Sequence, residues 1–229
     1  MDSNTAQLLA ATGAVHLPGA ATEMIPAIEA AISPDDHGRP GARLRDAAPL
    51  AALLGPDRAI GRAAAAALAA IGASGAPRPV RAILFDKNAD ANWALGWHQD
   101  RTVAVRERRA CEGFGPWTVK QGVIHVAPPF ALLQRMVTLR IHLDPVDPDN
   151  APLLIAEATH DRLWPEGEIA GAVAAARVRS CLAARGDVWA YATPILHASA
   201  AATRPRRRRV LQVDFAAEAL PAPLAWRGI

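Results

Sequence analysis

Two residues near the middle of the chain have side chains that can bind the same metal ion. His98 and Asp100 are separated by one residue within the segment 92–100. If this segment is a strand, alternate side chains point to the same side of the sheet, so an imidazole and a carboxylate lie together. A His-x-Asp pair is common by chance, and a hydrogen-bonded surface pair is the alternative interpretation. The pair therefore needs a further ligand before it indicates a metal site.

His197 is the candidate for that further ligand. It follows a segment that opens with Gly186-Asp187 and continues as an expected strand at 188–192. Together with His98 and Asp100 it would form a face of two histidines and one carboxylate. Non-haem Fe(II) oxygenases use this face because it leaves the other positions of an octahedron free for co-substrate and oxygen. Zinc more often has a closed tetrahedral site, so the three residues favour ferrous iron.

Arg208, eleven residues after His197, is a candidate anion anchor at the start of the expected strand 210–215. A guanidinium buried in a barrel requires an anion, and its planar fork fits a carboxylate. Ser199 lies two residues after His197 and can bond the same carboxylate. A dicarboxylate co-substrate could then bind the iron at one end and Arg208 at the other. The alternative for the run 206–209 is a solvated turn, and the register alone does not separate Arg208 from its neighbours.

Other polar residues are candidates for contacts with the co-substrate or the substrate. Lys87 and Asn92 precede the first ligand and are expected near the co-substrate; a solvated ammonium and a turn cap are the alternatives. His125, in a segment expected to be a loop over the mouth of the site, is a candidate substrate contact or an ordinary loop residue. Arg140 and His142 share one strand face and become candidates for the site if that face lines the interior.

The lysines give a weak additional signal. Only two of the 25 basic residues, Lys87 and Lys120, are lysines. In a chain so rich in arginine, a lysine can persist because a compact ammonium is needed at that place. Mutational chance explains the two lysines almost as well.

Short strands must position these residues. The segment Met136–Leu143 alternates between apolar and polar residues, which is typical of a strand that separates an apolar from a polar environment. Turn-forming residues separate it from similar segments. Strands are expected at Val80–Phe85, Met136–Leu143, Leu153–Ala156, Val178–Leu182, Val188–Ala192 and Val210–Phe215. Many short strands after a helical start predict a mainly β fold, a sandwich or barrel with flanking helices.

The first 79 residues differ in composition from the rest. They are rich in Ala and Leu, are interrupted by Pro and Gly, and are expected to be mostly short helices. A length of 229 residues fits a single domain. We therefore expect one domain over residues 1–229, with a helical N-terminal layer (1–79) packed on a β core (80–229).

The composition excludes several classes of protein. With 51% hydrophobic and 21% charged residues, the chain is not disordered. No apolar run is long enough to span a membrane and no basic segment of a secretory signal opens the chain, so we expect a cytoplasmic protein with no membrane partner. The net charge of +3 comes largely from arginines near 206–209, which lack an aromatic platform, so no nucleic-acid partner is expected. We expect a small-molecule substrate and a monomer or homodimer.

Five segments in order resemble the phytanoyl-CoA dioxygenase family of Fe(II)- and 2-oxoglutarate-dependent oxygenases, specifically its small bacterial members. They span roughly residues 80–226 and read ILFDKNADANWALGWHQD, GFGPWTVKQGVIHVAPP, TLRIHLDPVDPDNAPL, RGDVWAYATPILHAS and RRVLQVDFA. The family's iron ligands fall on His98, Asp100 and His197, and its 2-oxoglutarate arginine falls on Arg208. The resemblance implies a double-stranded β-helix (jelly roll, cupin-like) with iron near one mouth.

The resemblance also implies an activity. Fe(II), 2-oxoglutarate and O2 would be used to hydroxylate a small organic molecule, with release of succinate and CO2. Halogenating relatives replace the carboxylate ligand with a small residue, so Asp100 favours hydroxylation. Two alternatives remain open. One is a cupin-like metal-dependent isomerase or hydrolase, and the other is a non-catalytic anion-binding protein that uses the Arg206 to Arg209 cluster.

The chain departs from the family pattern in two turns. Where many relatives carry glycine, this sequence has Ala151 in the segment 150–153 and Ala158 in the segment 157–160. A glycine allows backbone conformations that other residues rarely adopt. The conformation of these loops and the identity of the substrate are therefore open, whereas the iron ligands are unaffected.

Overall fold

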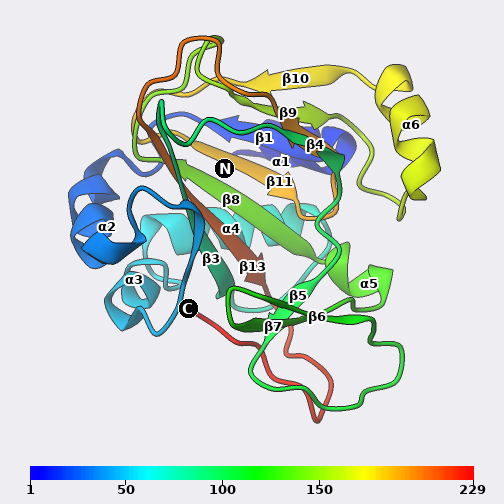
Figure 1. The fold of residues 1–229 in the computed structure, drawn as a ribbon. Coiled ribbons are helices and arrows are strands. Elements are labelled where there is room, and N and C mark those ends of the chain that lie inside the picture. Colours follow the sequence, from blue (N-terminus) through cyan, green and yellow to red (C-terminus); the bar gives the residue numbers. More distant parts are fainter.

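Two antiparallel sheets face each other and form the β core of the protein (Figure 1). The computed structural model describes residues 1–229, except for the side chain of Pro40. The strands are β1 (Ala14–Leu17), β2 (Pro40–Leu44), β3 (Arg78–Lys87), β4 (Leu95–His98), β5 (Val103–Val105), β6 (Trp117–Lys120), β7 (Val123–Val126), β8 (Met136–His142), β9 (Leu153–Ala156), β10 (Val178–Cys181), β11 (Val188–Ala192), β12 (His197–Ser199) and β13 (Arg208–Ala216). One sheet has the order β1-β11-β8-β13-β3-β2 and the facing sheet the order β10-β9-β12-β4, while β5-β7-β6 form a small third sheet. This is the double-stranded β-helix that the family resemblance implies.

The first four helices cover the outer face of the six-stranded sheet, and the last two pack elsewhere (Figure 1). The helices are α1 (Ser3–Thr12), α2 (Ile25–Ala31), α3 (Ala48–Leu53), α4 (Ala59–Ala70), α5 (Phe130–Leu133) and α6 (Ile169–Ala175). The largest hydrophobic core joins α1 to α4 with this sheet; Leu68 of α4 and Leu139 of β8 are both part of it. Alanine combines high helix propensity with a short side chain, so the Ala-rich α4 can pack close to the strands. Within the described chain, no helix has the length and apolar character required to cross a bilayer.

Strand β8 shows how the alternating pattern creates an interior site. Val137, Leu139 and Ile141 pack into the core beneath the helices, whereas Arg140 faces the space between the two sheets. Every residue of β8 is buried, including the polar ones. The polar environment that the alternation predicts is therefore an internal cavity and not the solvent.

All six strands predicted from the sequence are present, with ends within two residues of the expected positions. The N-terminal region is mostly helical as expected, but it also contributes β1 and β2 to the two edges of the six-stranded sheet. β1 pairs with β11 and β2 pairs with β3, both antiparallel. These strands have only four and five residues, which is too short for a distinct two-residue period in an Ala-rich sequence.

The two turns that have alanine where many relatives carry glycine adopt the conformation that glycine favours. Ala151 has φ 52° and Ala158 has φ 59°, so both lie in the left-handed region. The Ala151 carbonyl accepts a hydrogen bond from the guanidinium of Arg208. The turn geometry is thus present in the fold although alanine occupies these positions.

We expect Ala158→Gly to raise the free energy of unfolding by about 0.5–1 kcal/mol, because glycine removes the clash of a Cβ in the left-handed region. Ala158 is exposed, so the substitution leaves no cavity. The matched control is Ala170→Gly at an exposed position of α6, which should lower the free energy of unfolding by about 0.5–1 kcal/mol. Urea denaturation of both variants checks the prediction, and a destabilised Ala158→Gly protein would contradict it.

Candidate metal centre

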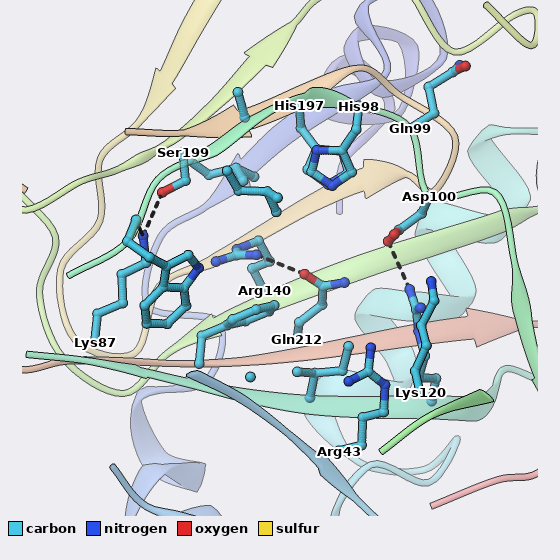
Figure 2. Close-up of a pocket in the computed structure, with 18 of the residues that line it drawn as sticks. Arg43, Lys87, His98, Gln99, Asp100, Lys120, Arg140, His197, Ser199 and Gln212 are labelled. Carbon is cyan, nitrogen blue, oxygen red and sulfur yellow. Dashed lines mark hydrogen bonds and ion pairs between the residues drawn. The ribbon is translucent and has the colours of Figure 1, made fainter. Parts of the chain in front are cut away.

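The structure brings His98, Asp100 and His197 together at one side of the space between the sheets (Figure 2). One potential ligand atom from each residue lies within 4.8 Å of the others. His98 ends β4 and His197 begins β12, and the two residues are direct partners in the antiparallel pair. Their ring centroids are 4.3 Å apart. Asp100 lies two residues after the end of β4. The three candidate ligands therefore come from one cross-strand pair of histidines and the segment that follows β4.

Hydrogen bonds fix both imidazoles in the form that binds a metal. The Nδ1 atom of His98 lies 2.8 Å from the carbonyl oxygen of Gly96, and Nδ1 of His197 lies 2.9 Å from that of Ile195. A carbonyl oxygen only accepts, so each Nδ1 carries a proton, and in the neutral ring this leaves the lone pair of Nε2 for a metal. Burial and the neighbouring His98 lower the pKa of His197 to about 4, so this ring is neutral at pH 7.

A buried arginine orients the third candidate ligand. The Arg81 Nη2 atom donates to Oδ2 of Asp100 at 2.8 Å, and Arg81 Nε donates to Asp214. Thr138 in turn donates to Asp214 at 3.0 Å. Burial opposes ionisation of Asp100, but the charge of Arg81 keeps its pKa below the usual value. Asp100 is therefore a carboxylate, and Arg81 occupies only one of its two oxygens.

Gln99 holds the chain between the two ligands in place. Its side-chain amide donates to the carbonyl oxygens of Arg162 at 2.9 Å and Pro194 at 2.6 Å, and its oxygen accepts from the backbone N–H of Trp164 at 2.9 Å. Gln99 points away from the ligand cluster (Figure 2). Strand β4 ends at His98, so Asp100 lies just beyond it and not on the strand as predicted, but the two side chains share one side as expected and Gln99 anchors the chain between them.

A cavity of about 520 Å³ adjoins the three candidate ligands. Its volume is in the range of small-molecule binding sites. Phe85, Trp93 and Leu95 contribute apolar surface to its wall, and Ser199 contributes a hydroxyl. The cavity can therefore hold an organic molecule in contact with the three candidate metal ligands.

Three cations, Lys87, Arg140 and Arg208, form an inner cationic cluster in this cavity. Lys87 Nζ donates to Ser199 Oγ at 3.2 Å and to a backbone carbonyl, and Arg140 Nη1 donates to Gln212 Oε1 at 2.8 Å (Figure 2). Arg208 is only 2% exposed and donates to a backbone carbonyl. Among the described side chains, no carboxylate lies within ion-pair distance of any of the three. Each cation is thus bonded to neutral groups alone.

The inner cationic cluster lacks a compensating negative charge, and the pKa values of two of its side chains are lowered. Burial and the nearby Arg140 lower the pKa of Arg208 to about 9, while burial, Arg208 and Arg140 lower that of Lys87 to about 8. Both groups stay charged at pH 7. The Nε atoms of Arg140 and Arg208 are buried without a hydrogen-bond partner. Since a buried cation is costly unless an anion accompanies it, this end of the cavity is built to receive one.

The four arginines at 206–209 have two different environments. Arg208 lines the cavity, while the other three arginines pair with carboxylates outside it. These pairs are Arg206 with Asp147, Arg207 with Asp86 at 2.9 Å and Arg209 with Asp144 at 2.7 Å. The four residues therefore do not form one unpaired cationic surface of the kind that binding to an anionic polymer would need.

Three residues predicted to contact the co-substrate or the substrate lie away from the cavity wall. Asn92 bonds the backbone of Ala202, at 3.0 Å through its Nδ2 and 2.7 Å through its Oδ1, and so joins two loops outside the cavity. His125 belongs to β7 instead of a loop, and its Nδ1 donates to the Val123 carbonyl in a buried position away from the cavity wall. His142 shares the inward face with Arg140 but does not line the cavity. Alternation predicts the face of a residue but not its depth along the strand.

Four further residues of the site were not singled out as site residues from the sequence. Arg81 was detectable in principle, because it is the one charged residue in the apolar segment 80–85. Lys120, one of the two lysines, also lines the cavity but is exposed to solvent, whereas Lys87 is buried. Arg43 and Gln212 also line it. Arg43 was hidden because its strand, β2, falls in the part of the chain expected to be helical.

Comparisons with known proteins support the fold. No family model and no curated protein matches the sequence. Among solved structures, AviO1 from Streptomyces viridochromogenes Tue57 is 20% identical, with 96% of this chain and 95% of that chain covered and a TM-score of 0.64. EctD from S. alaskensis, solved with 2-oxoglutarate and 5-hydroxyectoine, is 14% identical (95% and 76% covered, TM-score 0.65). SnoK, a non-heme alpha ketoglutarate dependent carbocyclase from nogalamycin biosynthesis, is also 14% identical (94% and 83% covered, TM-score 0.62). At these identities the likeness establishes a shared fold.

Proposed function

We propose that this protein is an Fe(II)- and 2-oxoglutarate-dependent oxygenase related to the phytanoyl-CoA dioxygenase family. One observation carries the proposal: a cluster of two histidines and one carboxylate shares a cavity with buried cations that lack an anion. The description of SnoK as alpha ketoglutarate dependent and the 2-oxoglutarate in the EctD structure support it. A metal-dependent isomerase or hydrolase would have no need for this second anion site.

The candidate ligands fit ferrous iron. The two Nε2 atoms and the second oxygen of Asp100 are free to bind, and they form the three-ligand face that leaves positions open for other ligands. When bound, iron would supply the reductive activation of O2, coupled to conversion of 2-oxoglutarate to succinate and CO2. Asp100 keeps the carboxylate ligand, which supports hydroxylation of a substrate carbon over halogenation.

The chain itself would bind and orient the 2-oxoglutarate. With one end of the molecule at the metal cluster, its far carboxylate would meet Arg208, whose planar fork fits two carboxylate oxygens. Ser199 and Lys87, which contact each other at 3.2 Å, lie in the same wall and can donate to the same group. Phe85 and Trp93 exclude water around it, which strengthens these interactions.

The proposal is tested by measuring succinate after the protein is mixed with Fe(II), ascorbate, 2-oxoglutarate and air. We expect succinate formation that requires both iron and 2-oxoglutarate and stops when a chelator is added. Binding of 2-oxoglutarate to the iron-loaded protein, measured anaerobically by calorimetry, provides a second readout that needs no substrate. A protein that neither binds 2-oxoglutarate nor forms succinate would contradict the proposal.

We expect Arg81→Lys to lower the affinity for Fe(II) about tenfold, the lower end of the effect seen when a partner of a metal ligand is changed. The lysine keeps the charge but cannot donate in a fixed fork to Asp100 and Asp214 at once. Arg227→Lys, at an exposed ion pair with Asp46, is the matched control and should bind iron normally. Anaerobic Fe(II) titration measures the effect, and equal affinities in both variants would show that Arg81 does not position Asp100.

A further inference from the structure

A second pair of cations lies across the cavity from the inner cationic cluster. Arg43 of β2 and Lys120 of β6, here called the outer cationic pair, both line the cavity. In Figure 2 they lie on the Asp100 side of the metal cluster, whereas Lys87 and Ser199 lie on the opposite side. The cavity therefore presents positive charge at two separate places.

The outer cationic pair is accessible to solvent: Arg43 is half-buried and Lys120 is exposed. Among the described side chains, neither Arg43 nor Lys120 has a carboxylate within ion-pair distance. Arg43 Nε is buried without a hydrogen-bond partner, and the contact with Gln121 uses the backbone N–H of Arg43 and leaves its guanidinium free. The carboxylate of Asp100 acts to raise the pKa of both side chains, but it is already bonded to Arg81.

The pKa values of Arg43 and Lys120 also indicate an excess of positive charge around them. Burial, followed by the charge of Arg81, lowers the pKa of both Arg43 and Lys120. Arg43 lowers the pKa of Lys120 further. A bound anion would reverse these effects, because a nearby opposite charge favours the charged form of both side chains.

The 2-oxoglutarate of the proposed function does not account for this pair. Its far carboxylate is assigned to Arg208, so an anion bound to the outer cationic pair would have to come from a second molecule. The wall between the two cationic regions includes Ile83 and Phe85, which are apolar. A ligand that fits here has an anionic group at one end and an apolar body that reaches toward the metal cluster.

We propose that the substrate is an organic anion, a carboxylate or a phosphate ester, whose charged group binds to Arg43 and Lys120. This inference rests on the proposed function, since it assigns the substrate class for the same cavity. The anion would fix the substrate at the Asp100 side and direct its apolar body past the ligands. Specificity would come from the charge, because a neutral analogue leaves both cations without an anion.

The test is calorimetric titration of the protein loaded anaerobically with Fe(II) and saturating 2-oxoglutarate. The probes are phenylacetate, phenyl phosphate and the neutral phenylacetamide. We expect at least one anionic probe to bind about tenfold or more tightly than the amide, as a charge-assisted contact requires. The tighter of the two anions then identifies the preferred group. Equal affinities for all three probes would overturn the inference.

Variants locate the binding site of the anion. Arg43→Gln and Lys120→Gln should each reduce the preference for the anion about tenfold while the affinity for 2-oxoglutarate stays within about twofold of wild type. The matched control is Arg45→Gln, an exposed arginine next to β2 that does not line the cavity, and it should leave the preference unchanged. A preference that persists in both cavity variants would contradict the assignment.

The two proposals fail in different ways. If the wild-type protein binds 2-oxoglutarate but shows no preference for the anionic probes, the substrate inference is wrong and the proposed function stands. If the protein does not bind 2-oxoglutarate, the proposed function is wrong. A preference for the anions that depends on Arg43 and Lys120 in the unloaded protein would then still support the anion site.

Discussion

Asp100→Ala is expected to lower 2-oxoglutarate-dependent succinate formation by at least about 100-fold. Changing a residue that only supports a metal ligand typically costs 10–100-fold, so removal of a ligand should cost no less. The variant should still fold, because Arg81 remains paired with Asp214 after the Asp100 carboxylate is lost. The loss of activity would then report on the metal cluster and not on the stability of the protein.

Asp147→Ala is the matched control for this variant. Asp147 is an exposed aspartate that pairs with Arg206 at the surface, so its removal takes away the same charge far from the cavity. We expect wild-type rates for Asp147→Ala, and thermal unfolding should show both variants folded. Near wild-type succinate formation by a folded Asp100→Ala protein would exclude this residue from the candidate metal centre.

Arg208→Met is expected to raise the 2-oxoglutarate concentration needed for half-maximal binding by about 10- to 100-fold. The substitution removes a charge-assisted pair, which typically contributes about 1.5–3 kcal/mol. It should not reduce the free energy of unfolding of the empty protein, because Arg208 is a buried cation without a carboxylate partner there. A loss of affinity without a loss of stability is the signature of a residue retained for ligand binding.

Arg209→Met distinguishes this role from a general effect of the arginine run. Arg209 pairs with Asp144 and Glu29 outside the cavity, so its loss should lower the stability and leave 2-oxoglutarate affinity unchanged. Calorimetry of 2-oxoglutarate binding and urea denaturation measure the two quantities for both variants. If Arg209→Met loses affinity and Arg208→Met does not, the register of the anchor is wrong.

The sequence predicts the β core well because a strand has a simple physical signature. The apolar segment at β3 and the alternation at β8 reflect burial on one or both faces of a sheet, and each of the six predicted strands lies within two residues of its expected position. The spacing of His98 and Asp100 predicts a shared side for the same reason. Their meeting with His197 is a long-range contact, which followed from the resemblance and from chemistry rather than from periodicity.

The remainder of the site depends on features that have no local signature. Arg43 reaches the cavity only because β2 adds to the edge of the sheet next to β3, and nothing in its own segment specifies that pairing. Arg140 and His142 share a face, but their depths in the barrel differ, so only Arg140 lines the cavity. Asn92 joins two loops by bonding to Ala202, a residue that is distant in the sequence.

A crystal structure of the protein prepared anaerobically with Fe(II) and 2-oxoglutarate tests the central claim most directly. We predict one iron ion bound by Nε2 of His98, Nε2 of His197 and a carboxylate oxygen of Asp100, with the far carboxylate of 2-oxoglutarate on Arg208. Iron density elsewhere, or 2-oxoglutarate that leaves Arg208 without an anion, would contradict the account.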